Sequence, residues 1–196
     1  MRHLKILGLL AVVAAVFMVF TASASATTVT GPAGETNPII HLVSEESAVA
    51  GTKHVVLHNP IATIECESTA EGQFTTVGGT GATTRGALTS LTFSPCTNQW
   101  VVDVNKPGFL EIHGEAGNKG TVTSLGTKIT ATRFGLECVY ETGANAIGTI
   151  TGGNPATLKL NGSIPINTTL SSFLCGSTPA SWTGAYKTTG TIDIDQ

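Results

Sequence analysis

The chain has 196 residues and a formal net charge of −3 at pH 7, and only 12% of its residues are charged. Its lysine and arginine residues form no run, whereas nucleic-acid binding needs clustered bases that neutralise phosphates. The composition therefore argues against a nucleic-acid partner. The motifs G-x-S-x-G and H-E-x-x-H and the P-loop do not occur in the sequence, which removes several common types of catalytic site.

The first 26 residues have the pattern of a secretory signal peptide. Arg2 and Lys5 supply the positive start, residues 6–20 form an apolar run, and Ala24-Ser25-Ala26 fits a small-residue cleavage site. The apolar run is shorter than the ~20 residues that a membrane-spanning helix needs. We therefore expect cleavage after Ala26, a secreted, extracellular protein, and no membrane contact once the signal has been removed.

From residue 27 onward, the chain reads as short strands separated by turns. Thr and Val favour strands, while Gly, Pro and Asn mark turns. We expect strands at 54–58, 62–68, 88–93, 100–104, 109–114, 121–124, 128–134, 135–141, 156–164 and 181–187. This spacing predicts an all-β fold, an antiparallel β-sandwich or partly closed barrel of about ten short strands, preceded by the signal-peptide helix.

Two segments are harder to assign. Residues 27–50 read as an N-terminal extension that holds either a strand or a short helix. Residues 75–86, TTVGGTGATTRG, are rich in Gly and Thr, and we expect them to form a mobile hairpin arm. The expected organisation is a signal peptide over 1–26, the extension over 27–50, and a single β domain over 51–196.

A glutamate precedes a cysteine at two places in the chain, Glu65-Cys66 and Glu137-Cys138. Side chains on a strand alternate between its two faces. Cys66 shares a face with Ile64, and Cys138 shares a face with Leu136 and Tyr140, so both sulfurs should point into the core. The glutamates, with Glu67, should point to solvent. A glutamate on the opposite face cannot act as the base of the adjacent thiol.

Four cysteines in a secreted chain predict two structural disulfides, with three possible connectivities. Each Glu-Cys site precedes an expected strand that contains Leu, Ser and Phe and ends in a second Cys, LTSLTFSPC at Cys96 and LSSFLC at Cys175. This partial repeat suggests two related halves, and it favours the pairs Cys66–Cys96 and Cys138–Cys175. A zinc site usually shows close ligand pairs such as C-x₂-C, and the sequence has none.

Several stretches together resemble a family of small secreted all-β proteins from soil actinobacteria. The resemblance covers most of residues 54–187 and is carried by HVVLHNPIATIECEST, LTFSPCTNQWVVDV, GFLEIHG, TRFGLECVY, IGTITGGNPATLKLNGSIP and FLCGS with WTGAY. It implies export and a bacterial source. It assigns no catalytic or binding residue.

The histidines and acids, which are the residue types that bind metal ions, are not favourably spaced for a shared ion. His54 and His58 would be ~13 Å apart on a strand and could not chelate one ion. Glu111, His113 and Glu115 share a strand face, which we interpret as a solvated surface. We therefore expect neither a metal nor a cofactor.

A non-enzymatic role as a binding or structural module, at the cell envelope or outside the cell, fits these features best. Its partner would be a protein or a glycan of the envelope. Trp100 and Trp182 could stack on sugar rings, although core packing is the default for such residues. The alternatives are a protease inhibitor, which needs a rigid protruding loop, and an extracellular hydrolase. A hydrolase would need two acids, such as Glu65, Glu67 or Glu137, in one cleft ~5–10 Å apart.

Overall fold

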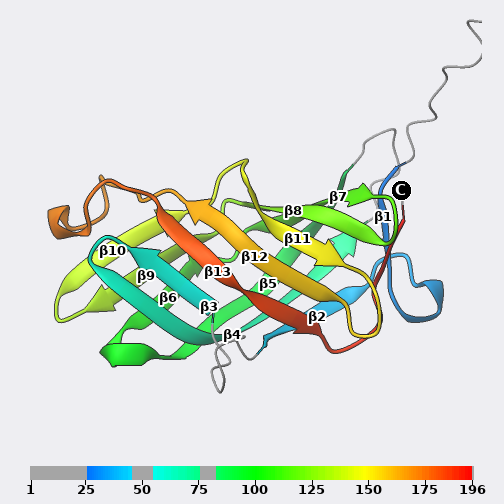
Figure 1. Cartoon of the computed structure of the whole chain (residues 1–196), viewed down its shortest axis with the longest axis horizontal. Helices are drawn as coiled ribbons and strands as arrows, with labels where there is room; N and C mark the ends of the chain where they lie inside the picture. Colours follow the sequence, from blue (N-terminus) through cyan, green and yellow to red (C-terminus); the bar gives the residue numbers. More distant parts are fainter. Residues whose placement is uncertain (1–25, 46–54, 76–82, 196) are drawn as a thin grey trace, which may run out of the picture.

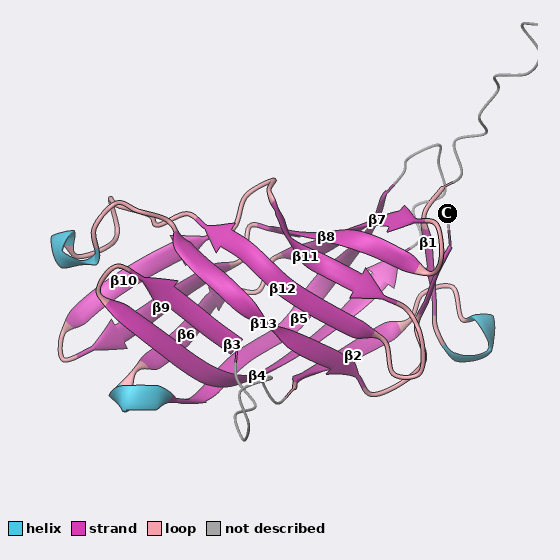
Figure 2. Cartoon of the chain, in the orientation of Figure 1, coloured by secondary structure: helices cyan, strands magenta, loops and turns pink. Residues whose placement is uncertain are grey.

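The structure is a computed structural model that describes residues 26–45, 55–75 and 83–195. These residues form fourteen strands and three short 3₁₀-helices, so the expected all-β class is confirmed (Figure 2). The strands are β1 Thr28–Thr30, β2 Ile39–Ser44, β3 Val55–Asn59, β4 Ala62–Thr75, β5 Thr83–Cys96, β6 Val101–Lys106, β7 Phe109–Glu115, β8 Lys119–Leu125, β9 Lys128–Arg133, β10 Leu136–Glu141, β11 Ala146–Thr151, β12 Thr157–Ile164, β13 Ala180–Thr188 and β14 Asp193–Asp195; the helices are η1 Pro32–Gly34, η2 Thr97–Gln99 and η3 Phe173–Cys175.

Eight of the strands close into a ring, which we call the main barrel. Its order is β4, β5, β7, β8, β11, β12, β13 and β2, which pairs again with β4. Every neighbouring pair in the ring is antiparallel (Figure 1). The barrel interpretation of the sequence is therefore the one that the structure shows, and the closure leaves no free edge in the ring.

The remaining strands of the large sheet extend the barrel toward one end. β3 fills the space between β4 and β13 beyond the end of β2. On the other side of β4, strands β6, β9 and β10 continue from the far part of β5. Strands β4 and β5, of 14 residues each, are long enough to serve both parts. We call the end with η2, η3 and the β9–β10 turn the disulfide end (Figure 1).

The opposite end, which we call the terminal end, is closed by the two ends of the described chain. β1 and β14 pair as a separate two-stranded ribbon, with Val29 opposite Ile194. Both of these side chains are buried, and the hydroxyl of Thr27 accepts a hydrogen bond from the backbone N–H of Gly114. Within the described residues 27–45, β1 and β2 are thus strands of the fold, and the short-helix alternative is limited to η1; residues 46–50 of the expected extension lie outside the described residues.

The core follows the alternation that the sequence predicts. Cys66 and Cys138 are buried, as are both tryptophans, Trp100 and Trp182. A glycine is required where two strands approach closely: a Cβ added to Gly148 on β11 would lie 2.1 Å from the carbonyl oxygen of Lys159 on β12. This close contact lies beside the register shift between Ala146 and Gly148 in the pairing of β11 with β8.

Three sequence expectations need correction. The stretch LSSFLC is not a strand; it forms turns and η3. In the expected arm over 75–86, Thr75 and residues 83–86 are strand, Thr84 is buried, and Gly86 packs against the Phe74 ring, while 76–82 lie outside the described residues. Strands β1, β11 and β14 had no counterpart among the expected strands, because they are short or rich in Gly and Thr.

Candidate functional site

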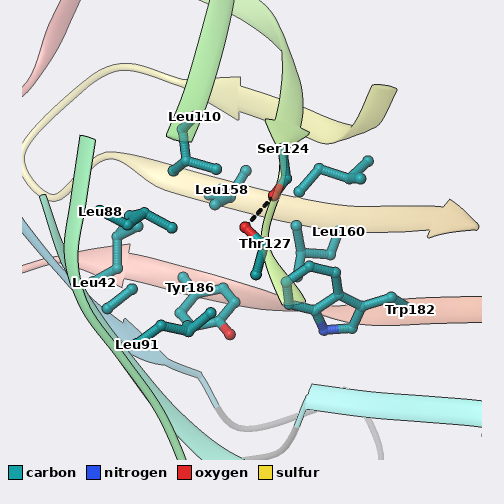
Figure 3. A pocket seen from close by; sticks show the side chains of 12 residues that line it. Leu42, Leu88, Leu91, Leu110, Ser124, Thr127, Leu158, Leu160, Trp182 and Tyr186 are labelled. Atoms are coloured by element: carbon teal, nitrogen blue, oxygen red, sulfur yellow. Dashed lines mark hydrogen bonds between the residues drawn. The ribbon is translucent and has the colours of Figure 1, made fainter. Parts of the chain in front are cut away.

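The void among the core residues of the main barrel is too small for an organic ligand. A void of about 20 Å³ lies among leucines, Trp182 and Tyr186 (Figure 3). That volume corresponds to about one water molecule. The hydroxyls of Ser124 and Thr127, which border it, hydrogen-bond to one another at 2.8 Å. Side chains therefore fill this part of the barrel, and the candidate binding sites described below lie on the surface.

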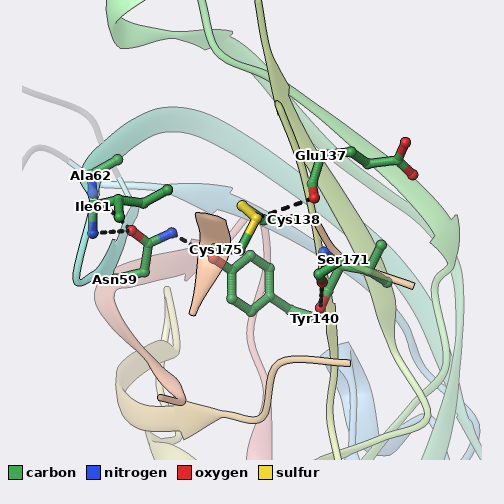
Figure 4. Close-up of a disulfide and its surroundings, with 9 residues drawn as sticks. Asn59, Ile61, Ala62, Glu137, Cys138, Tyr140, Ser171 and Cys175 are labelled. Atoms are coloured by element: carbon green, nitrogen blue, oxygen red, sulfur yellow. Dashed lines mark hydrogen bonds between the residues drawn. A yellow bond between two sulfur atoms is a disulfide. The ribbon is translucent and has the colours of Figure 1, made fainter. Parts of the chain in front are cut away.

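The acids that the hydrolase alternative needs do not line a groove together. Glu65 and Glu67 lie on β4 and Glu137 on β10, and these strands are not neighbours in the sheet. None of the three lines either of two open grooves, of about 320 and about 400 Å³. Glu137 is exposed, and its carboxylate points away from the adjacent disulfide (Figure 4). This arrangement gives no support to a pair of catalytic carboxylates.

The candidate metal ligands are separated or engaged elsewhere. His54 lies outside the described residues, and His58 Nδ1 is 2.8 Å from the hydroxyl of Thr63. Glu111 pairs with Arg85, and Glu115 accepts a hydrogen bond from Thr121. Across residues 26–45, 55–75 and 83–195, no group of three or more His, Cys, Asp or Glu side chains is placed to hold a metal ion.

Two disulfides stabilise the disulfide end, and they join the pairs expected from the sequence. Cys66–Cys96 links residues that face each other on β4 and β5. Cys138–Cys175 links β10 to η3, in the loop that follows β12. The first disulfide reinforces an existing strand pair, whereas the second fixes a loop to the sheet.

Hydrogen bonds hold the same loop along β10. The backbone N–H of Ser172 donates to the Glu137 carbonyl at 2.8 Å. The hydroxyl of Ser171, labelled in Figure 4, accepts from the Val139 N–H at 2.8 Å. On the buried face of β10, which also carries Cys138, the Tyr140 hydroxyl accepts a hydrogen bond of 2.5 Å from the side-chain amide of Asn59. The loop over 165–175 is therefore held by covalent and polar contacts.

Large apolar side chains point outward at this end. Phe173 is 88% exposed and Phe134, in the β9–β10 turn, is 80% exposed. Leu170 and Leu174 are also more than half exposed. We call these four residues the apolar end. Scattered exposed apolar residues are normal, but a group held on fixed loops at one end typically marks an interaction site.

An arginine beside the apolar end contacts two aromatic rings. The Arg133 guanidinium carbon is 4.8 Å from the centre of the Phe134 ring and 5.9 Å from the centre of the Trp100 ring. Its Nε atom is buried and has no hydrogen-bond partner. The ion pairs of the described residues do not include Arg133.

An open groove of about 400 Å³ continues from this stack between β5 and β6. The two strands pair through a single residue pair, Phe93 with Val102, and then diverge. Trp100 and Val101 line the groove, so the tryptophan belongs both to the groove and to the stack. The disulfide end thus combines apolar side chains, a cation and a groove.

Sequence reasoning did not find this site. Arg133 and Phe134 were assigned to an ordinary strand end, and Phe173 and Leu174 to a strand. The available signal was the Phe134-Gly135 step between two strand patterns, because a large apolar residue is unusual in a tight turn. The approach of Trp100 to Arg133 depends on the pairing of β6 with β9, which local sequence does not reveal.

Comparison of the chain with protein-family models, with curated protein sequences and with solved structures gave no match. Among the described residues, no helix is both long and apolar enough to cross a membrane. The fold and surface described above therefore define the class, a disulfide-linked β module built on a closed antiparallel barrel.

Proposed function

We propose that this chain is an exported, non-enzymatic binding module whose apolar end docks onto a partner polypeptide outside the cell. The observation that carries the proposal is the exposure of Phe134 and Phe173, at 80% and 88%, on a turn and a loop that are held in place. Exposing two phenylalanines costs solubility and contributes nothing to the core. Fixed loops also reduce the entropy that is lost on binding.

A polypeptide suits this surface better than a glycan does. The apolar end consists of phenylalanines and leucines, which contact apolar side chains but offer no hydrogen bonds to sugar hydroxyls. Arginine and aromatic residues are enriched among the residues that dominate protein–protein affinity. The groove between β5 and β6 adds polar backbone and side-chain groups at the edge of the surface.

Export is supported by the signal-like N-terminus and by the two disulfides, which form and persist in oxidising compartments. Thr27, the first residue after the expected cleavage site, is already buried in the fold. N-terminal sequencing of protein recovered from the medium of a bacterial host should start at Thr27. An intact Met1 in that material would contradict processing.

Binding can be tested without knowing the natural partner. Random peptides displayed on phage would be selected against the oxidised chain that starts at Thr27, and the bound site would be mapped by hydrogen exchange. We expect selected peptides to protect the backbone around 133–137 and 170–175. Protection confined to the terminal end, or selection of no peptide at all, would overturn the proposal.

A matched pair of substitutions sharpens this test. Leu174 and Ile39 are both 56% exposed, but Ile39 lies on β2, away from the disulfide end. Leu174→Ser should weaken the selected peptides by about tenfold, which is the value of one well-packed apolar contact. Ile39→Ser should leave their affinity unchanged. Equal effects of the two substitutions would show that general hydrophobicity, and not this surface, is responsible.

A further inference from the structure

We propose that Arg133 determines the specificity of the docking surface by binding a carboxylate of the partner polypeptide. This inference rests on the proposed function and names the chemistry that the partner must present. The expected ligand is an Asp or Glu side chain, or a C-terminal carboxylate, next to an apolar residue that contacts Phe134.

The other described arginine shows what such a site looks like when a carboxylate is present. Arg85 lies over the Phe109 ring, 5.6 Å from its centre, and its guanidinium also binds the carboxylate of Glu111, with Nε to Oε1 at 2.8 Å. Arg133 contacts two aromatic rings, but among the described residues it forms no ion pair with an acid. Both arginines lie against aromatic side chains, but only Arg85 also binds a carboxylate among the described residues.

The ring contacts prepare Arg133 for this role. Contacts with two rings limit the orientations of the planar guanidinium. Because the Nε atom is buried, the terminal Nη groups are the N–H donors that remain for a ligand. Planar donors of this kind bind a carboxylate through two parallel hydrogen bonds. A partly desolvated cation strengthens such a pair, because the local dielectric is lower than that of water.

The nearest carboxylate on the same hairpin does not occupy this position. Arg133 pairs with Leu136 across the β9–β10 turn, and Glu137 follows Leu136 on the opposite face of the strand. Figure 4 shows the Glu137 carboxylate pointing away from the Cys138–Cys175 disulfide and out from the strand. Among the described residues, therefore, no carboxylate forms an ion pair with the guanidinium.

The backbone at Phe134 supports a role beyond folding. Phe134 has φ +48° and Gly135 has φ +80°, so both central residues of this two-residue turn are left-handed. Such turns favour Asn-Gly, because a large side chain is strained at positive φ. Phe134 gains no burial in return, since it is 80% exposed. Strained, exposed residues of this kind occur most often at functional positions.

The peptide selection described above tests this inference directly. Peptides selected on the disulfide end should be enriched in Asp or Glu beside an aromatic or aliphatic residue. Arg133→Gln should weaken such a peptide about tenfold, and replacing its acid by the amide should cause the same loss, without a further loss when both changes are combined. Arg133→Lys should recover only part of the affinity. Arg85→Gln, the matched control, should leave it unchanged.

Phe134→Asn separates binding from structure. Because Asn-Gly suits this turn, we expect the melting temperature to stay the same or rise, while affinity for the acidic peptide falls about tenfold. A lower melting temperature with unchanged affinity would show that Phe134 is structural. Peptides that bind the apolar end without an acid preference, or that bind Arg133→Gln equally well, would overturn the role of Arg133 and leave the proposed function intact. Failure to select any peptide would overturn both.

Discussion

The two ends of this barrel are closed in different ways. At the terminal end, the β1–β14 ribbon turns Val29 and Ile194 inward, and the Asn118 side chain donates to Asp193 at 3.0 Å and accepts from the Ile194 N–H at 2.8 Å. At the disulfide end, a covalent bond and backbone hydrogen bonds hold the loop, while phenylalanines and leucines face outward.

The difference shows how an apolar surface can be kept exposed without losing the fold. Within η3, Cys175 is the buried residue, so burial of apolar area does little to hold this segment. The disulfide replaces that contribution by restricting the unfolded chain and the loop. Apolar side chains of this segment are thereby free to face solvent, whereas the β1–β14 ribbon at the terminal end buries Val29 and Ile194.

Removing each disulfide in turn should produce the largest losses of stability, and it tests most directly whether the two disulfides have different roles. Loop entropy gives ~3.5–4 kcal/mol of lost stability for Cys66→Ser with Cys96→Ser and for Cys138→Ser with Cys175→Ser. Urea unfolding measures this loss. Only the second pair should also increase proteolytic cleavage within 165–175, because only that disulfide fixes the loop. Equal cleavage in both variants would contradict the division of roles.

The two tyrosines of the chain allow the main barrel and its extension to be compared in alkaline solution. Tyr186 lies on β13 of the main barrel, and Tyr140 lies on β10 of the extension. Burial raises the pKa of both Tyr140 and Tyr186 above the ordinary value of 10.0, while a hydrogen bond with Asn59 or Ser68 partly offsets the increase. The folded state then retains protons that the unfolded state releases, so stability should be constant below about pH 10 and fall above it.

The measurement is the ultraviolet absorbance of tyrosinate during an alkaline titration. We expect the signal to appear together with unfolding and not before. Tyr140→Phe and Tyr186→Phe should each reduce the alkaline loss of stability and cost ~1 kcal/mol at neutral pH through the lost hydrogen bond. Tyrosinate formation in a chain that is still folded would show that one of the two sites opens locally.

Substitution of surface glutamates should have the smallest effects. Glu137→Gln at the disulfide end should change stability by less than ~0.5 kcal/mol, because the side chain is exposed and makes no ion pair in the described structure. Glu111→Gln should cost up to ~1 kcal/mol, since Glu111 faces Arg85 across β5 and β7. Urea unfolding at low and high salt would measure the stability of both variants. A larger loss for Glu137→Gln than for Glu111→Gln would show that Glu137, and not Glu111, forms the stabilising ion pair.

Sequence patterns predicted the parts of this structure that depend on local alternation. Cys66, Cys138 and the inward leucines of β12 follow from a period of two, and the expected disulfides followed from the order of the cysteines. The closure of the main barrel could not be predicted, because it depends on β2 pairing with both β4 and β13. The strand expected over residues 170–175 was wrong, because an apolar stretch resembles a strand even where a disulfide holds it as a loop.

The pairing of β1 with β14 places both ends of the described chain on the same side of the molecule, with Thr28 opposite Asp195 (Figure 1). A tether, fusion domain or solid support attached through either terminus would therefore present the apolar end away from the point of attachment. The same proximity makes the fold a suitable scaffold for circular permutation, in which a short linker joins the old termini and new ones are opened elsewhere.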